Sequence, residues 1–243
     1  MSWTSRCNEG GRLFVVLSDA LMGLFPPGAV VAELHGPGDV SELLPAEAAC
    51  LGGAVAKRAQ EFAAGRQCAR RALVEFGVTE FALRATADRQ AVWPHMIAGS
   101  ITHTDGFCAA VVDSRQRVAG IGIDSEVVGA VGAHLWPTIC VSSELAWLES
   151  LPQTERAAAV TLLFSAKEAF FKCQYPLYGE RLTCHELCFQ VEEGSRSDGA
   201  WSLRKTKTLS ANNCAVRAIV GRYLFHDRFV STGVALPASS KRV

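Results

Sequence analysis

Two carboxylates lie two residues apart at the end of a short apolar run. The run is Gly120-Ile121-Gly122-Ile123, and it leads into Asp124-Ser125-Glu126. Side chains alternate faces along a strand, so Asp124 and Glu126 would point the same way. Two like charges held that close repel each other unless a cation or a proton lies between them. Mg²⁺ prefers carboxylate and phosphate oxygens, so the pair is a candidate magnesium site; a solvated strand end or a helix-capping carboxylate is the alternative.

A second stretch, residues 164–172, contains good helix formers and neither glycine nor proline. At about 100° per residue, one face of this helix would carry Phe164, Glu168, Phe171 and Lys172, with Lys167 at its edge. Glu168 and Lys172 could form a surface ion pair, but such a pair is not expected to share a face with two phenylalanines. We therefore expect Glu168 and the lysines to be partly buried. Glu168 would be a third carboxylate for the metal, and Lys167 and Lys172 would bind an anionic substrate.

Two further elements would position these groups. The two glycines of the Gly120 run suit a strand with another backbone packed close by. Residues 55–76 read as a strong helix with an apolar stripe. Its basic residues Arg58 and Arg66 are eight apart, roughly two turns, and so lie near the same side. A solvated basic face and a phosphate site both remain open at this point, since the guanidinium fork suits bidentate binding of phosphate.

The rest of the chain mixes helical and strand patterns, which predicts an α+β fold. Strands are expected at residues 29–34, 81–83 and 107–112, and a polar hairpin-like turn at 113–118. A helix that starts near Thr154 is expected to run to about Cys173 and to stop at Tyr175-Pro176-Leu177. Alternating apolar and polar residues at 187–191, 201–203 and 214–220 predict an antiparallel sheet.

Composition limits the classes of function. The 243 residues carry a formal net charge of zero, so there is no overall field to attract nucleic acid, and any anion site must be a local cluster. The nine cysteines are scattered without a Cys-x-x-Cys pair, which favours reduced thiols in a cytoplasmic protein. A zinc-like stretch, residues 184–188, lacks a second pair of ligands. No stretch approaches the roughly 20 apolar residues of a membrane span.

Five stretches taken together resemble the surfactin-type and enterobactin-type 4′-phosphopantetheinyl transferases, especially their longer bacterial branch. They are Lys57-Arg58-x-x-Glu61-Phe62-x-x-Gly65-Arg66, Trp93-Pro94, Gly99-Ser100-Ile101-Thr102-His103, Gly120-Ile121-Gly122-Ile123-Asp124-x-Glu126 and Phe164-Ser165-x-Lys167-Glu168-x-x-x-Lys172. The resemblance implies two similar α+β halves packed as a pseudo-dimer, with coenzyme A (CoA) in the cleft between them. The halves would be residues 1–118 and 119–243.

The resemblance also implies a reaction. The phosphopantetheine arm of CoA would pass to a serine hydroxyl of an acyl or peptidyl carrier protein, leaving adenosine 3′,5′-bisphosphate. Asp124, Glu126 and Glu168 would bind Mg²⁺ with the CoA pyrophosphate, which Lys172 would contact. The adenosine end and its 3′-phosphate would be bound by Arg58, Arg66, Thr102 and His103, with Arg89 nearby. Glu168 is the first candidate to accept the serine proton, directly or through a water, and Lys172 is the second.

Other functions stay open on the residues alone. A Mg²⁺-dependent phosphohydrolase or nuclease could use the same carboxylates with water as nucleophile. A CoA-binding module without catalysis and a purely structural α+β domain are the remaining alternatives. Fatty-acid, polyketide and nonribosomal peptide carriers all fit, as does siderophore assembly. A chain that closes as a pseudo-dimer is expected to be a monomer.

Overall fold

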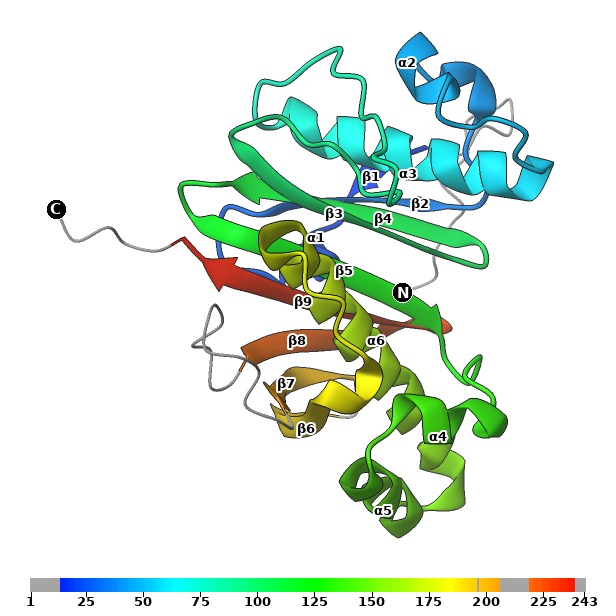
Figure 1. Cartoon of the computed structure of the whole chain (residues 1–243), viewed down its shortest axis with the longest axis vertical. Coiled ribbons are helices and arrows are strands. Elements are labelled where there is room, and N and C mark those ends of the chain that lie inside the picture. Colours follow the sequence, from blue (N-terminus) through cyan, green and yellow to red (C-terminus); the bar gives the residue numbers. More distant parts are fainter. Residues whose placement is uncertain (1–13, 196, 206–218, 239–243) are drawn as a thin grey trace, which may run out of the picture.

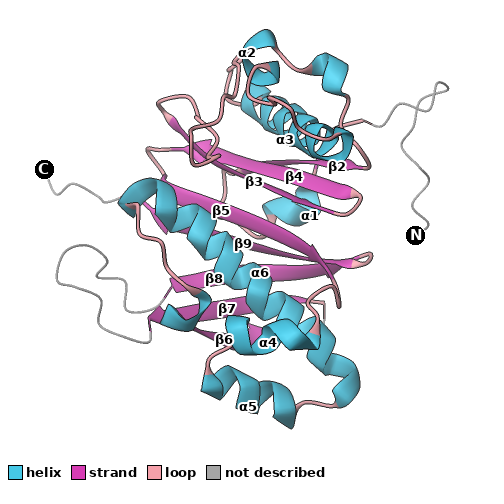
Figure 2. Cartoon of the chain, turned by 45° about the vertical axis from the view of Figure 1, so that its right-hand side comes forward, coloured by secondary structure: helices cyan, strands magenta, loops and turns pink. Residues whose placement is uncertain are grey.

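The described chain forms two antiparallel sheets, each covered by one long helix (Figure 1). The computed structural model describes residues 14–195, 197–205 and 219–238. Helix α3 (Ala56–Val74) packs on the first sheet and helix α6 (Gln153–Tyr178) on the second. Figure 2 shows the two helices lying over different sheets. This is the α+β fold that the sequence predicts.

The first sheet has four strands in the order β1-β2-β4-β3. Their bounds are Val16–Leu17 for β1, Val30–His35 for β2, Ile97–Thr104 for β3 and Phe107–Ser114 for β4. Short helices precede α3, namely α1 (Asp19–Met22), α2 (Pro45–Ala48) and the single 3₁₀ turn Val40–Glu42. Helix α3 lies close to the sheet because small residues face it, among them the fully buried Ala69 and Ala72.

The second sheet has five strands in the order β5-β9-β8-β7-β6. Their bounds are Val118–Val127 for β5, Leu187–Gly194 for β6, Asp198–Lys205 for β7, Ile219–His226 for β8 and Phe229–Pro237 for β9. Between β5 and β6 lie α4 (Trp136–Ile139), α5 (Ser142–Ser150) and α6, with 3₁₀ turns at Ala133–Leu135 and Cys184–Glu186.

Side-chain hydroxyls join the two sheets. Strands β3 and β5 run side by side (Figure 1), and no backbone hydrogen bond connects them in the described residues. Instead the hydroxyl of Ser100 accepts from the backbone N–H of Ile123 at 3.2 Å, and that of Thr102 accepts from the N–H of Ser125 at 2.9 Å. The seam, by which we mean these two pairs, is one of the contacts between the halves; apolar residues of both sheets, among them Val111 and Ile123, also pack in one cluster.

Helix α6 approaches β5 closely at the two glycines of that strand. A Cβ atom on Gly122 would lie 2.0 Å from the carbonyl oxygen of Ala169, and one on Gly120 would lie 2.6 Å from that of Cys173. Both contacts are with backbone, which cannot turn aside as a flexible side chain can. The predicted close approach of a second backbone is therefore confirmed, and that backbone belongs to α6.

The sequence-based expectations fail at three elements. Residues 81–83 are not a strand but extended chain, because the N–H and C=O of Leu83 bond to side chains of Glu47 and Arg66 rather than to a partner strand. The turn at 113–118 is no hairpin, since β4 and β5 belong to different sheets. Pro176 does not stop α6, because it lies in the last turn and the helix ends at Gly179 with a positive φ of 65°.

Other expectations remain as predictions or lie outside the described residues. The division at residue 118 stays a prediction, although β5, which opens the second sheet, begins there. The strand expected at 214–220 lies mostly outside the described residues, and its end forms the start of β8. In the ranges that the structure describes, no helix is long and apolar enough to cross a bilayer.

Replacing Gly122 by alanine is expected to lower the free energy of unfolding by about 2–3 kcal/mol, because the new methyl group forces α6 away from β5. Urea unfolding followed by circular dichroism measures the change. Gly53→Ala is the matched control, since a Cβ there meets no atom within 4 Å. Equal stabilities of the two variants would show that α6 can move away at no cost.

Candidate active site

Strand β5 and helix α6 bring the predicted acidic residues and Lys172 together. Asp124 is 3% exposed, and its Oδ1 lies 2.7 Å from the ammonium of Lys172. The hydroxyl of Thr102 also donates to Oδ1, at 3.4 Å. The other carboxylate oxygen of Asp124, Oδ2, is buried without a hydrogen-bond partner. The site therefore holds one buried negative charge that its neighbours satisfy only in part.

Burial and mutual repulsion act on the two other carboxylates. Burial, followed by the charges of Asp124 and Glu168, raises the pKa of Glu126 to about 7, although Lys172 acts in the opposite direction. Burial and the charge of Asp124 likewise raise the pKa of Glu168. These are the shifts expected where like charges share a small space, so the three carboxylates form one electrostatic group.

The residues present fit a divalent cation. As they stand in the described part of the chain, no three His, Cys, Asp or Glu side chains form a ready metal cluster. In this arrangement Lys172 holds one oxygen of Asp124. The unpartnered Oδ2 of Asp124 and the repulsion felt by Glu126 and Glu168 are the conditions that a bound cation would relieve.

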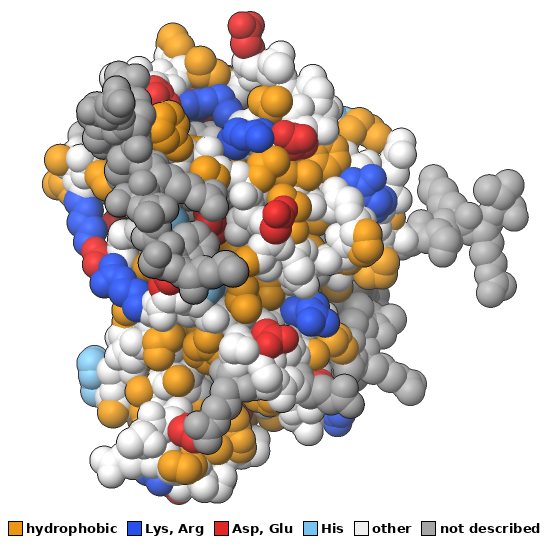
Figure 3. All heavy atoms as spheres, turned by 180° about the vertical axis from the view of Figure 1, so that it is seen from behind, with side chains coloured by type: hydrophobic (Ala, Val, Ile, Leu, Met, Phe, Trp, Pro, Cys, Tyr) orange, Lys and Arg blue, Asp and Glu red, His pale blue; other side chains and the backbone are white. Residues whose placement is uncertain are grey.

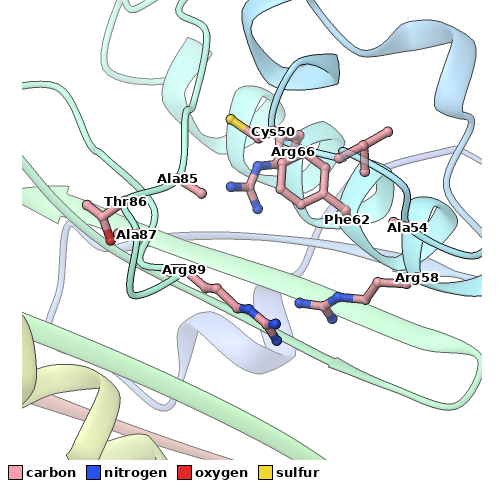
Figure 4. Close-up of a pocket in the computed structure, with 10 residues that line it drawn as sticks. Cys50, Ala54, Arg58, Phe62, Arg66, Ala85, Thr86, Ala87 and Arg89 are labelled. Carbon is pink, nitrogen blue, oxygen red and sulfur yellow. The ribbon is translucent and has the colours of Figure 1, made fainter.

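A cavity of about 640 Å³ opens between α3 and the loop that precedes β3 (Figure 4). Arg58 and Arg66 from α3 and Arg89 from the loop line it, and the guanidinium groups of Arg58 and Arg89 point towards each other. A second cavity of about 370 Å³ shares these three arginines and extends to Lys172 and Phe171 on α6. The two cavities thus form a cationic path from α3 to Lys172, whose ammonium bonds to Asp124.

Arg66 is the most deeply buried of these cations. It is 7% exposed, its Nε donates to the carbonyl of Leu83 at 3.1 Å, and its guanidinium lies 3.7 Å from the centre of the Phe62 ring. Its Nη2 is buried without a hydrogen-bond partner, and burial lowers the pKa of Arg66 to about 10. An anion in the 640 Å³ cavity would supply both the missing hydrogen bond and the missing negative charge.

His103 and Arg58 form a pair at the point where the cavities meet. Nη1 of Arg58 donates to Nε2 of His103 at 2.9 Å, and it also lies 3.4 Å from a carboxylate oxygen of Glu61. Burial is the largest effect on His103 and lowers its pKa, which favours the neutral ring that accepts this bond. The pair places a cation and an imidazole on the wall of the second cavity.

Two predicted substrate contacts lie elsewhere. Lys167 is 2% exposed and points away from Asp124, and its ammonium bonds to Glu144 at 2.7 Å and to the carbonyls of Ile139 and Cys184. Thr102 is 1% exposed and lines neither cavity, because its hydroxyl serves the seam and Asp124. The helical-wheel estimate put Lys167 at the edge of the catalytic face, but that edge faces α5.

Sequence reasoning missed Glu47, which supports Arg66. Glu47 is fully buried, forms an ion pair with Arg70 and accepts the N–H of Leu83 at 2.9 Å. The carbonyl of the same Leu83 holds Arg66. The partners of Glu47 lie 23 and 36 residues away in the sequence and could not be read from the local pattern.

A contact between the halves was also missed. Asp88, in the loop that carries Arg89, accepts from the hydroxyl of Tyr175 and from Arg181, each at 3.2 Å. Tyr175 stacks on Phe171, with ring centres 5.1 Å apart. These contacts connect the end of α6 to the loop beside the arginine-lined cavity.

Comparison with known proteins agrees with this geometry. The sequence model of the 4′-phosphopantetheinyl transferase N-terminal domain matches residues 46–113, and that of the 4′-phosphopantetheinyl transferase superfamily matches residues 120–219. The 4′-phosphopantetheinyl transferase Npt of Nocardia iowensis is 31% identical over 87% of this chain and 97% of its own. The chain belongs to the 4′-phosphopantetheinyl transferase family.

A second relative supports this placement. The 4′-phosphopantetheinyl transferase Svp of Streptomyces mobaraensis is 39% identical over 90% of this chain and 89% of its own. The holo-[acyl-carrier-protein] synthase of Thermotoga maritima aligns with 49% of this chain and 63% of its own, at 26% identity and a TM-score of 0.35, which is too low for a comparison of folds. The family transfers the phosphopantetheine group of CoA to carrier proteins, and this chain is a transferase of that family.

The two lysines of the family motif are expected to differ in effect. Lys167→Met leaves Glu144 buried and unpaired, so it should lower the free energy of unfolding by about 3–5 kcal/mol. Lys172→Met also removes the cation from a buried carboxylate, that of Asp124, but Lys172 is 29% exposed, so water can reach the carboxylate and the loss should be smaller, about 1–2 kcal/mol. Urea unfolding of both variants gives the comparison. Similar losses of unfolding free energy in the two variants would contradict the different roles of the two lysines.

Stability should depend on pH through Glu126. The folded protein keeps a proton on Glu126 up to about pH 7, whereas the unfolded chain releases it near the usual value of 4.5. The folded state binds more protons between these values, so stability falls as the pH rises across the window. The glutamine of the variant Glu126→Gln has no proton to lose in this range, so the variant does not lose stability in this way. It should be more stable than the wild type at pH 8 but not at pH 4.5. Urea unfolding in the presence of EDTA at pH 4.5 and pH 8 measures the difference in stability between the two proteins. The same difference at both pH values would contradict the raised pKa of Glu126.

Proposed function

We propose that this protein transfers the 4′-phosphopantetheine arm of CoA to a serine hydroxyl of an apo carrier protein, releases adenosine 3′,5′-bisphosphate and requires Mg²⁺. The observation that carries the proposal is the arginine-lined path that ends at Lys172, whose ammonium lies 2.7 Å from Asp124. A cationic path ending at a group of carboxylates suits a polyanion bound together with a divalent cation.

The adenosine end of CoA would occupy the arginine-lined cavities. CoA carries three phosphates, and a neutral protein needs local cations to bind them. The 3′-phosphate would receive hydrogen bonds from Arg66, whose Nη2 lacks a partner, and from Arg58 and His103. Arg89 would contribute charge from the loop. Thr102 is assigned a positioning role, because its hydroxyl holds Asp124 rather than facing the cavity.

The pyrophosphate end would lie at the acidic group. Asp124, Glu126 and Glu168 would hold Mg²⁺ together with pyrophosphate oxygens. The metal supplies charge neutralisation on those oxygens when bound. Lys172 would contact the pyrophosphate, since its flexible ammonium already lies beside Asp124 and is 29% exposed.

Glu168 would accept the proton of the carrier serine. The serine oxygen attacks the phosphorus that bears the pantetheine arm, and the bond from that phosphorus to the bridging oxygen breaks. Adenosine 3′,5′-bisphosphate leaves with the electron pair. The support for this role is position: Glu168 lies on α6 four residues before Lys172, in the acidic group where the pyrophosphate would lie, and a carboxylate there can accept the proton directly or through a water. Both halves that form the cleft come from one chain, so we expect the protein to act as a monomer. Its nine scattered cysteines favour reduced thiols, so we expect it to act in the cytoplasm.

The test is the intact mass of apo carrier proteins after incubation with this protein, CoA and Mg²⁺. We expect the carrier to gain one phosphopantetheine group on its serine, and to gain none when EDTA is present. Glu168→Gln should lower the rate by at least about 100-fold, the usual contribution of a general base. Glu149→Gln, an exposed change of the same kind on α5, is the matched control and should keep the wild-type rate.

Two outcomes would contradict the proposal. One is release of adenosine 3′,5′-bisphosphate from CoA at the same rate without a carrier, which would indicate a hydrolase. The other is no gain of mass on fatty-acid, polyketide or peptide carriers while CoA still binds, which would indicate a CoA-binding protein without this activity.

A further inference from the structure

One thiol stands apart from the other described cysteines. Cys50 is exposed, Cys184 and Cys188 are half-buried, and four others are buried: Cys68, Cys108, Cys140 and Cys173. Cys50 lies in the segment between α2 and α3, where its thiol donates to the carbonyl of Ala46 at 3.4 Å. It also lines the 640 Å³ cavity (Figure 4).

The surroundings of Cys50 are cationic. The described residues that line the cavity include Arg58, Arg66 and Arg89 and no acidic side chain. Figure 4 shows the sulfur of Cys50 beside the guanidinium of Arg66. Arg66 is more than nine-tenths buried and its Nη2 has no hydrogen-bond partner, so the wall of the cavity that Cys50 also lines lacks an anion to pair with this guanidinium. A cleft lined by one sign of charge raises the local concentration of molecules of the opposite sign.

We propose that Cys50 is a site of thiol–disulfide exchange with small anionic disulfides, of which glutathione disulfide is the biological example, and that the adduct blocks CoA binding. The Cys50 thiolate attacks one sulfur of the disulfide, the S–S bond breaks, and the other half leaves as a thiolate. The disulfide is the oxidant, and a free thiol reverses the step. The blocking of CoA rests on the proposed function, whereas the modification does not.

The other described thiols are less suited to this reaction. Burial raises the pKa of Cys140 to about 11 and also raises that of Cys184, to which the charges of Glu168 and Glu144 contribute. The cation beside these two thiols, Lys167, is buried and already paired with Glu144, so it offers no free charge to an anionic reagent. Cys188 lies 3.6 Å from the hydroxyl of Ser143 and lines neither arginine-lined cavity. Selectivity for Cys50 therefore follows from exposure and charge together.

The adduct would occupy the place proposed for the adenosine end of CoA. A glutathionyl group brings two carboxylates into a cavity whose cations are Arg58, Arg66 and Arg89. Its carboxylates would pair with the same guanidinium groups that we assign to the 3′-phosphate. The ratio of small disulfides to free thiols around the protein would thus control the activity of the transferase through Cys50.

The first experiment treats the full-length protein with glutathione disulfide in the absence of CoA and maps all nine cysteines by peptide mass spectrometry. We expect Cys50 to be modified first, and prior addition of CoA to slow its modification by at least about tenfold. Preferential modification of another cysteine would overturn the inference.

The second experiment compares an aromatic disulfide bearing two carboxylates with neutral dipyridyl disulfide. Each rate at Cys50 is divided by the rate of the same reagent with N-acetylcysteinamide. We expect the anionic reagent to be favoured by about tenfold or more at low salt. The advantage should shrink in 1 M salt and in Arg89→Gln, because both weaken the attraction. Equal normalised rates for the two reagents would overturn the electrostatic basis.

The effect on CoA is measured by calorimetry before and after glutathionylation, with Cys50→Ser as the variant that cannot form the adduct. Each protein is compared with its own untreated sample. We expect the adduct to lower CoA affinity at least about tenfold in the wild type and treatment to leave Cys50→Ser unchanged. If Cys50 is modified and the affinity for CoA does not change, the inference that the adduct blocks CoA binding is overturned. Absence of CoA binding in the untreated protein would instead contradict the proposed function.

Discussion

The site depends on how closely helix α6 lies on strand β5. Two residues without a Cβ, Gly120 and Gly122, let the carbonyls of Cys173 and Ala169 approach the strand backbone. This approach fixes the distance between carboxylates that come from different elements. Asp124 and Glu126 continue the strand beyond the glycines, and Glu168 and Lys172 lie on the helix on either side of Ala169. The raised pKa values of Glu126 and Glu168 are the electrostatic consequence of this packing.

Helix α6 is held from two sides by ion pairs of different kinds. On one side Lys172, which is partly exposed, neutralises Asp124. On the other, Lys167 and Glu144 are each about 1% exposed and hold α6 to α5. Glu144 further accepts the N–H of Phe189, so the pair also reaches β6. Adjacent residues 167 and 168 thus differ in their contacts: Lys167 holds α6 to α5, and Glu168 belongs to the group of carboxylates around Asp124.

The local sequence pattern was enough to predict much of this arrangement. The alternation of a strand placed Asp124 and Glu126 together, and the two glycines indicated the neighbouring backbone. The pattern failed where partners are distant. Nothing near Lys167 in the sequence points to Glu144, and nothing near Glu47 points to Leu83, whose bonds to Glu47 and Arg66 replace the predicted strand. Thr102 resembled a ligand contact, yet its hydroxyl bridges the two halves.

The charges on the surface agree with the neutral composition, since Figure 3 shows basic and acidic side chains interspersed over the described part of the rear face.

The seam has a different kind of consequence. Ser100 and Thr102, and no backbone ladder, link β3 to β5 in the described residues, and apolar side chains of both sheets pack in one cluster behind them. Side chains can be exchanged one at a time while each sheet keeps its own hydrogen bonds. The width of the cleft is therefore a trait that evolution could adjust without rebuilding either half.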